Sequence, residues 1–264
     1  MKRHLWFFLL NNLLVLGCLL GLWQLVVSLL HVPAYMLPGP LVVGAAVVHR
    51  FPSLVQSLLL TSTAAALGLA GSVIIGVAIA LVFAQWAGLR RLLFPYTILL
   101  QTVPIVAIAP LILMWAGSGV ASVALVAFII CLPPIIANTT QGLISVEENL
   151  VDLFLMHHAT AAQILFKLRL PHALPNLFVG MRISAGISVI GAITGELFAG
   201  SSRVGQGGLG DSILYASGQL ETDYLFALVF AATVLGFVFF FAGMFLEWHF
   251  LHHWHESNRS DVLE

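Results

Sequence analysis

One acidic residue, Glu196, lies well inside an apolar stretch of the chain, at about residues 178–199. A carboxylate within a membrane is costly and usually faces a protein interior or water. Three hydroxyl residues, Ser184, Ser188 and Thr194, share this stretch at near-helical spacing. Two readings stay open for these four polar groups. They line a solute path or an outer gate, or they form hydrogen bonds that hold neighbouring helices together.

A glycine-rich run, Gly205-Gln206-Gly207-Gly208-Leu209-Gly210, matches the GxGxxG pattern of dinucleotide sites. Such a site requires a preceding β-strand in a βαβ unit, and here an apolar segment precedes the run. We therefore interpret the run as a turn or a re-entrant segment. The sequence contains no GxxxxGK[ST] pattern, so we do not expect it to hydrolyse ATP by that route.

Histidines crowd the C-terminal tail, at His249, His252, His253 and His255. A metal site requires three or four ligands in a fixed geometry. Because these histidines follow the end of an apolar segment, the pattern favours interfacial side chains, and we predict no metal site.

The composition is that of an integral membrane protein. The chain has 264 residues, of which 60% are hydrophobic and 8% charged, whereas about a quarter of the residues in an average soluble domain are charged. The formal net charge of −1 gives no indication of a nucleic-acid partner.

The apolar segments predict an all-α membrane protein with six spans in a single domain, residues 1–264. The predicted spans cover about residues 5–30, 54–87, 92–115, 120–142, 178–199 and 224–248. Gly117-Ser118-Gly119 is the predicted break between the third and fourth spans. Prolines interrupt both of these spans, and such breaks persist in a membrane only where protein or water satisfies the backbone. They indicate a cavity or a helix seam.

A polar connection, at about residues 147–175, separates the fourth and fifth spans. Its centre is amphipathic, with Leu150, Leu153, Phe154 and His157 on one helical face. Two Leu-Pro pairs follow, Leu170-Pro171 and Leu174-Pro175. Because proline disfavours helix in the preceding residue, we predict that the helix ends near Leu170 and that the chain turns there.

Lysine and arginine are distributed unevenly between the two predicted sides. With a cytoplasmic N-terminus, one side holds eight of the ten: Lys2, Arg3, Arg90, Arg91, Lys167, Arg169, Arg182 and Arg259. The other side holds Arg50 and Arg203. The positive-inside rule therefore predicts that both termini and the 147–175 connection are cytoplasmic.

This connection resembles the cytoplasmic coupling (EAA) loop in permease subunits of bacterial ABC importers. Asp152 falls at the Glu position and Leu170-Pro171 at the Leu-Pro position. Over residues 37–247 the chain is also similar to the nitrate/sulfonate/taurine branch of these permeases. The matching motifs are Leu37-Pro38-Gly39-Pro40, Gln101-x-x-Pro104-x-x-Ala107-x-x-Pro110-Leu111, Trp115-x-Gly117, Pro133-x-x-x-x-Asn138-Thr139, Leu174-Pro175, Gly180-x-Arg182, Gly195-Glu196 and Thr222-Asp223.

The connection departs from the family pattern at two places. Leu153-Phe154 stand where the family has Ala-Ala, and His158 stands where it has glycine. Because histidine lacks the backbone freedom of glycine, we expect that it does not supply the free turn found in relatives.

The resemblance implies a type I importer in the bacterial inner membrane. In such an importer two copies of the permease form the translocation path, a cytoplasmic ABC ATPase dimer docks on the coupling helices, and an extracytoplasmic substrate-binding protein delivers the solute. ATP and Mg²⁺ would then bind to the ATPase, with no cofactor on this chain. The implied solutes are nitrate, sulfonates or taurine, and pyrimidine precursors.

The resemblance also implies two groups of site residues. The ATPase-coupling residues are Asp152, Leu153, Phe154, His157, His158, Ala159, Lys167, Leu170 and Pro171. The residues of the translocation path or gate are Gln101, Pro104, Ser184, Ser188, Thr194 and Glu196. Two alternatives remain. An ion-coupled secondary transporter would be expected to carry more intramembrane ionisable groups, and a non-transporting membrane anchor would use the histidine tail to bind metal.

Overall fold

The computed structural model describes residues 2–199 and 207–255, and this part of the chain contains helices and no β-strand. The side chains of residues 2–10, 12, 13, 16 and 252–255 lie outside this description. The helices are α1 (Lys2–Leu29), α2 (Pro40–His49), α3 (Phe51–Gln85), α4 (Ala87–Thr102), α5 (Ile105–Ala116), α6 (Val120–Ile144), α7 (Glu148–Met156), α8 (Ala161–Ile164), the π-helical turn η1 (Leu165–Arg169), α9 (Leu170–Ala199), α10 (Leu209–Gly218) and α11 (Thr222–His255).

Four helical stretches in the described residues are long and apolar enough to cross a membrane. They are α3, α6, the continuous stretch Ala161–Ala199, and Thr222–Leu251 of α11. Helices α4 and α5 make a fifth crossing if they are counted as one broken span. Helix α1 coincides with most of the predicted first span, and Gly17–Leu29, within the part whose side chains are described, is a shorter apolar helix. The six-span arrangement therefore stays a prediction.

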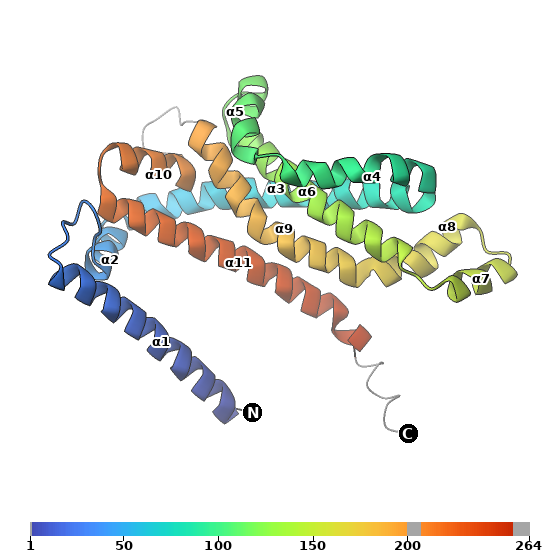
Figure 1. Ribbon diagram of the computed structural model, residues 1–264, viewed down its shortest axis with the longest axis horizontal. Coiled ribbons are helices and arrows are strands. Elements are labelled where there is room, and N and C mark those ends of the chain that lie inside the picture. Colours follow the sequence, from blue (N-terminus) through green and yellow to red (C-terminus); the bar gives the residue numbers. More distant parts are fainter. Residues whose placement is uncertain (1, 200–206, 256–264) are drawn as a thin grey trace.

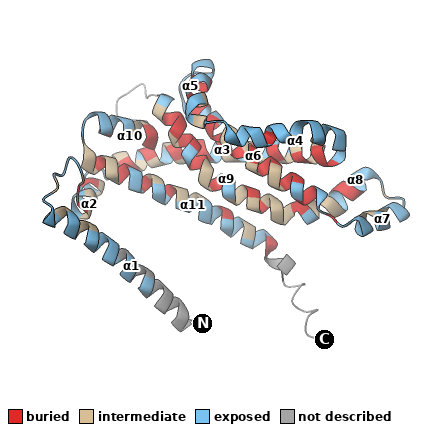
Figure 2. Ribbon diagram, in the orientation of Figure 1, coloured by how far each residue is buried: buried red, intermediate tan, exposed pale blue. Residues whose placement is uncertain are grey.

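Helix α3 runs along the longest axis of the molecule, α6, α9 and α11 are inclined to it, and α1 slants away from the bundle (Figure 1). Helices α7 and α8 are at one end, and α2 and α10 are at the opposite end. Half of the most apolar part of both α6 and Ala161–Ala199 is buried, against 28% for α3 and 22% for α11. The pair α6 and α9 is therefore the centre of the bundle, as the burial colours of Figure 2 also show.

Helices α3, α6 and α9 approach one another most closely around Ala127 of α6. A Cβ atom added to Gly68 of α3 would lie 2.6 Å from the Ala127 Cβ, and one added to Gly191 of α9 would lie 2.8 Å from its Cα. Neither position has room for a side chain. Small residues at helix interfaces allow this close van der Waals contact, which is a main source of helix association in membranes.

The prediction that a helix ends near Leu170 is wrong. The helix that begins at Ala161 continues through Pro171 and Pro175 to Ala199, so the predicted start of the fifth span lies inside it. The reason is the π-helical turn η1, in which the Leu170 N–H donates to the Leu165 carbonyl. A proline ring normally collides with the carbonyl four residues earlier. The wider turn before Pro171 relieves that collision, and the helix persists.

The predicted third span, residues 92–115, is two helices rather than one. Helix α4 ends at Thr102, α5 begins at Ile105, and the two are bent by 99° at Val103 and Pro104. The predicted break at Gly117-Ser118-Gly119 is confirmed, since both glycines have positive φ angles, +83° and +137°. The helix α6 that follows closely matches the bounds of the predicted fourth span, but the prediction that prolines interrupt this span is wrong, because Pro133 and Pro134 lie inside a continuous helix.

An ion pair fixes the end of the bundle that carries α2 and α10. Arg50, between α2 and α3, makes two hydrogen bonds to Glu221, the residue before α11, with an Nη2–Oε1 distance of 2.7 Å. The same guanidinium lies 4.7 Å from the centre of the Tyr224 ring. The hydrogen bond from Arg50 lowers the pKa of the Glu221 carboxyl, and the pair joins the start of α3 to the start of α11.

The lowered pKa of Glu221 predicts a pH-dependent contribution to stability. The pair stabilises the folded protein above the unfolded-state pKa, and this stabilisation is lost as the pH falls through the lower folded-state pKa. A partly exposed pair contributes about 0.2–1 kcal/mol. We expect Glu221→Gln to lower the melting temperature in detergent by about 1–3 °C at neutral pH and to have no effect in acid. Equal effects at both pH values would contradict the assignment, and Arg50→Gln with the double variant measures the coupling.

Candidate functional site

The predicted coupling segment consists of α7, α8, η1 and the turn at residues 157–160. Helix α7 extends away from the bundle, and none of its residues is buried (Figures 1 and 2). Its apolar side chains are accessible, with Leu153 48% and Met156 78% exposed. An amphipathic helix stabilised by its own protein would bury one face. Helix α7 leaves its apolar side chains open to a partner.

The turn between α7 and α8 forms at His158, although we expected that a histidine at this position would not supply the turn. His158 has a φ angle of +54°, in the left-handed region where glycine is favoured. Histidine is enriched among the non-glycine residues found there, so the conformation is attainable. A capping box then starts α8: the Thr160 hydroxyl accepts from the Gln163 N–H at 3.3 Å, and the Gln163 side chain accepts from the Thr160 N–H at 2.8 Å.

A concavity of about 260 Å³ opens on this segment. Its lining residues are Leu153, Phe154, His157, Ala159, Gln163 and Lys167. Five of these are predicted coupling residues, and Gln163 is the one that sequence reasoning missed. Its Thr-x-x-Gln spacing from Thr160 is a capping-box signal that could have placed it on the first turn of a helix.

The other four predicted coupling residues do not line the concavity. Asp152 and His158 are exposed but do not line it. Leu170 and Pro171 are half-buried at the start of α9, and Leu170 packs against the bundle. The structure therefore brings most of the predicted residues together and separates the Leu-Pro pair from them.

At the opposite end of the bundle, Glu196 belongs to a buried cluster of hydrogen-bonded polar groups. Its Oε2 atom accepts hydrogen bonds from the Thr61 hydroxyl at 2.9 Å and from the Gly210 N–H at 2.8 Å. The Thr61 hydroxyl oxygen accepts from the Leu209 N–H at 2.8 Å. Leu209 and Gly210 are the first residues of α10, whose N–H groups have no acceptor within the helix. Glu196 therefore serves as the acceptor for this helix end.

This contact explains the glycine-rich run. A Cβ added to Gly210 would lie 2.4 Å from the Ile193 carbonyl oxygen and 2.7 Å from the Glu196 Cβ. A helix N-terminus favours an acidic group, and here the acidic group belongs to the protein itself. Ser57 extends the cluster by donating to the Gly207 carbonyl at 3.0 Å. Gly205 and Gln206 lie outside the described residues.

The three hydroxyl residues of α9 are buried between helices. Ser184 donates to the Cys131 carbonyl of α6 at 3.0 Å, and the Cys131 thiol donates to the Ser184 carbonyl at 3.3 Å. Ser188 and Thr194 donate to carbonyls of their own helix, at 2.7 and 2.8 Å. The reading of hydrogen bonds between neighbouring helices therefore fits Ser184, whereas Ser188 and Thr194 make their hydrogen bonds within α9.

The other two predicted path residues lie at the bend between α4 and α5. Gln101 and Pro104 are both exposed there, and Pro104 is the N-cap residue of α5. A cavity of about 290 Å³ at this bend is lined by Leu100, Gln101, Val103, Ile105, Ile108, Ile129, Ile130, Pro134 and Ile187. Gln101 is the polar side chain in this lining, so its amide is the group there that can bind a solute by hydrogen bonds.

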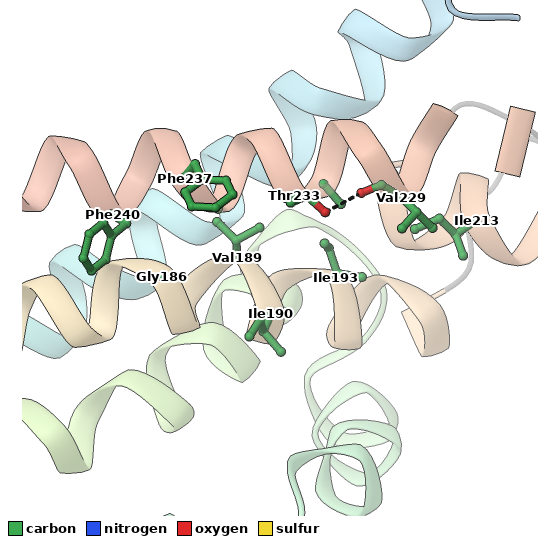
Figure 3. Close-up of a pocket in the computed structure, with 11 residues that line it drawn as sticks. Gly186, Val189, Ile190, Ile193, Ile213, Val229, Thr233, Phe237 and Phe240 are labelled. Carbon is green, nitrogen blue, oxygen red and sulfur yellow. Dashed lines mark hydrogen bonds between the residues drawn. The ribbon is translucent and has the colours of Figure 1, made fainter. Parts of the chain in front are cut away.

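A larger groove of about 600 Å³ lies between α9 and α11 (Figure 3). Apart from Thr233, its lining is apolar or glycine, as with Val189, Ile190 and Phe237. The Thr233 hydroxyl already donates to the Val229 carbonyl at 2.9 Å, as the dashed line in Figure 3 marks. The groove therefore offers a hydrophilic solute no polar side chain that is free to bind it.

The described residues contain no group of three His, Cys, Asp or Glu side chains that could hold a metal ion. The side chains of His252, His253 and His255 lie outside the description, so the prediction about the tail is not tested.

Comparison with known proteins identifies this arrangement. The family described as "Binding-protein-dependent transport system inner membrane component" matches residues 72–250. A probable ABC transporter permease protein of Haemophilus influenzae is 31% identical over 234 residues, covering 89% of this chain and 94% of that protein. The formylaminopyrimidine transport permease protein ThiX of Halalkalibacterium halodurans is 31% identical over 238 residues, covering 87% and 90%.

The fold also matches a solved structure. The MetNI methionine ABC transporter in an inward-facing conformation superimposes with a TM-score of 0.62 at 20% identity, covering 75% of this chain and 96% of that chain. At this identity the likeness concerns the fold alone, which is that of a type I ABC importer membrane subunit.

The Glu196 cluster predicts graded effects of substitution. Glutamine keeps an acceptor oxygen for Thr61 and Gly210, whereas alanine leaves a buried N–H without a partner, at a cost of about 1–3 kcal/mol. We expect Glu196→Ala to lower the melting temperature clearly more than Glu196→Gln, and Glu196→Gln to impair transport while membrane insertion is retained. Ile183→Ala, an exposed position on the same helix outside the predicted path, is the control. A Glu196→Ala protein as stable as the unmodified protein would rule out the capping role.

Proposed function

This chain belongs to the family of binding-protein-dependent transport system inner membrane components, and on that premise we propose how it works. Two copies of the chain form the path by which a small solute crosses the inner membrane. A substrate-binding protein delivers the solute from outside, and an ABC ATPase dimer in the cytoplasm supplies the energy. ATP and Mg²⁺ bind to the ATPase subunits, and this chain converts their movement into a change of access.

The exposed apolar side chains of α7 are the observation that carries this proposal. Leu153 is exposed and Phe154 is half-buried; both line the concavity together with His157, and α7 has no fully buried residue. The competing account, in which these side chains pack on the permease itself, has little support from this arrangement. A short amphipathic helix beside a concavity suits helix-in-groove docking, in which a few apolar anchors supply most of the affinity.

The continuous helix Ala161–Ala199 supports a direct transfer of movement. The far side of the concavity belongs to α8 and η1, through Gln163 and Lys167, and these turns continue into α9 without a break. A push on the coupling segment would therefore move α9 as part of the same rigid element. Rigid-body rocking of helices around a central site is the usual form of alternating access in transporters.

For the solute, we propose one of the classes carried by this branch: nitrate, sulfonates or taurine, or pyrimidine precursors. The cavity at the bend between α4 and α5 has no charged residue in its lining, and Gln101 is its polar side chain. A lining of this kind discriminates weakly between small polar solutes. We therefore assign most of the selectivity to the binding protein.

An ion-coupled secondary transporter is less well supported. Such a protein requires an intramembrane ionisable group that exchanges an ion during transport. Glu196 instead is 6% exposed and holds the first turn of α10.

We further propose that both termini and the coupling segment face the cytoplasm. The basic residues Arg90, Arg91, Lys167 and Arg169 belong to helices that meet at the α7–α8 end of the molecule, whereas Arg50 lies at the opposite end (Figure 1). This distribution agrees with the positive-inside rule.

Cysteine labelling tests this orientation. After removal of Cys18 and Cys131, a cysteine at exposed Gln219 should react with an impermeant reagent in intact cells. Cysteines at Met156 and in the C-terminal tail should react only after the membrane is opened. Labelling of Met156 or of the tail from outside would refute the proposed topology.

Docking of the ATPase predicts a second result. Removing a buried aromatic anchor from an interface costs about 2 kcal/mol or more, which is over tenfold in affinity. We expect Phe154→Ala to leave the permease folded and dimeric but to lower co-purification of the ATPase, or to uncouple hydrolysis from transport. Leu155→Ala is the matched control, because Leu155 is exposed and does not line the concavity. Full ATPase retention with full transport in Phe154→Ala would place the docking contact elsewhere.

A further inference from the structure

Arg169 connects the coupling segment to a helix that is distant in the sequence. It is the last residue of η1, and its Nη1 atom donates a hydrogen bond to the Ala84 carbonyl at 3.0 Å. Ala84 lies in the last turn of α3, which ends at Gln85. Carbonyl groups in a last turn have no donor within their own helix, and a cation there is favoured by the helix dipole.

An apolar cluster surrounds this hydrogen bond. Leu165 of η1 packs against Ala80 and Ala84 of α3, Leu143 of α6 and Ala173 of α9, with Leu170 beside them. Alanine side chains allow the helix backbones to approach closely. The π-helical turn is thus the place where the coupling segment meets α3, α6 and α9 at once.

The two basic residues of η1 lie on different sides of the turn. Lys167 is exposed and lines the concavity proposed for the ATPase. Arg169 is half-buried and contacts α3. One side of η1 therefore faces the proposed partner, and the other is attached to the bundle.

The contact made by Arg169 is incompletely satisfied. Its Nε atom is buried and meets no acceptor among the described residues. A buried donor without an acceptor is costly, so the hydrogen bond to the Ala84 carbonyl offsets only part of the cost of burying this guanidinium.

From these observations we infer that Arg169 is a positioning residue that carries movement of the coupling segment to α3. This inference rests on the proposed function. Movement from the ATPase then reaches α3 through Arg169 and the apolar cluster, in addition to α9, which continues directly from η1. Without the guanidinium, only the apolar cluster would link η1 to α3, so α3 would follow the movement of η1 less closely.

Distance measurements across the homodimer test this inference without knowledge of the solute. A single spin label at Met156 reports on α7, and one at exposed Ala78 reports on α3. The distance between the two copies of each label is measured for the permease–ATPase complex, with and without MgATP and vanadate. In the unmodified protein we expect both distances to change.

Arg169→Gln should separate the two movements. The Met156 pair should still respond to MgATP and vanadate, whereas the Ala78 pair should lose more than half of its response. Arg169→Lys, which keeps the charge, should retain more of the Ala78 response than Arg169→Gln. Phe166→Ala is the control on the same turn, because Phe166 is exposed and does not line the concavity, and it should leave the Ala78 response intact.

Three outcomes are distinguishable. An unchanged Ala78 response in Arg169→Gln would overturn the inference. Loss of both responses together with loss of the ATPase would also overturn it, because Arg169 would then support docking or folding. If neither distance responds in the unmodified protein although the ATPase is bound, the proposed function itself fails, and with it the basis of the inference.

Discussion

The close approach of α3, α6 and α9 around Ala127 is the constraint on which the rest of the structure depends. Gly68 and Gly191 leave no room for a side chain there, so the backbones of α3 and α9 each lie directly against α6. Ser184 and Cys131 reinforce the seam with reciprocal hydrogen bonds between α9 and α6. Lipid is as apolar as the helices, so close packing and interhelical hydrogen bonds supply the association.

A hydrogen bond from or to an ionisable side chain lies at each end of this seam, acidic at one end and basic at the other. At one end, the acidic side chain of Glu196 accepts from the first turn of α10. At the other end, the basic side chain of Arg169 donates to the last turn of α3. Each side chain complements the partial charge of the helix end that it meets. The seam between these ends is mainly apolar and closely packed, which suits the proposed movement of helices as rigid bodies.

The prolines led to a wrong prediction of where a helix ends. The Leu-Pro pairs at residues 170–175 predicted a turn, yet Pro171 and Pro175 lie in a continuous helix. A π-helical turn accommodates the first of them, and its formation depends on packing against α3 and α6. Pro104 had the opposite outcome, since the chain bends there by 99° between α4 and α5. Proline therefore ends a helix at position 104 but not at positions 171 and 175.

The sequence by itself determined the membrane class, the positions of most apolar helices and the family, because these follow from local hydropathy and from motifs at fixed spacing. It also located Leu153, Phe154 and His157 on one helical face. Only the tertiary structure decided that Glu196 meets α10 and that Arg169 meets α3. The partners in both contacts are distant in sequence or are backbone groups, and neither kind of contact leaves a periodic signal in the sequence.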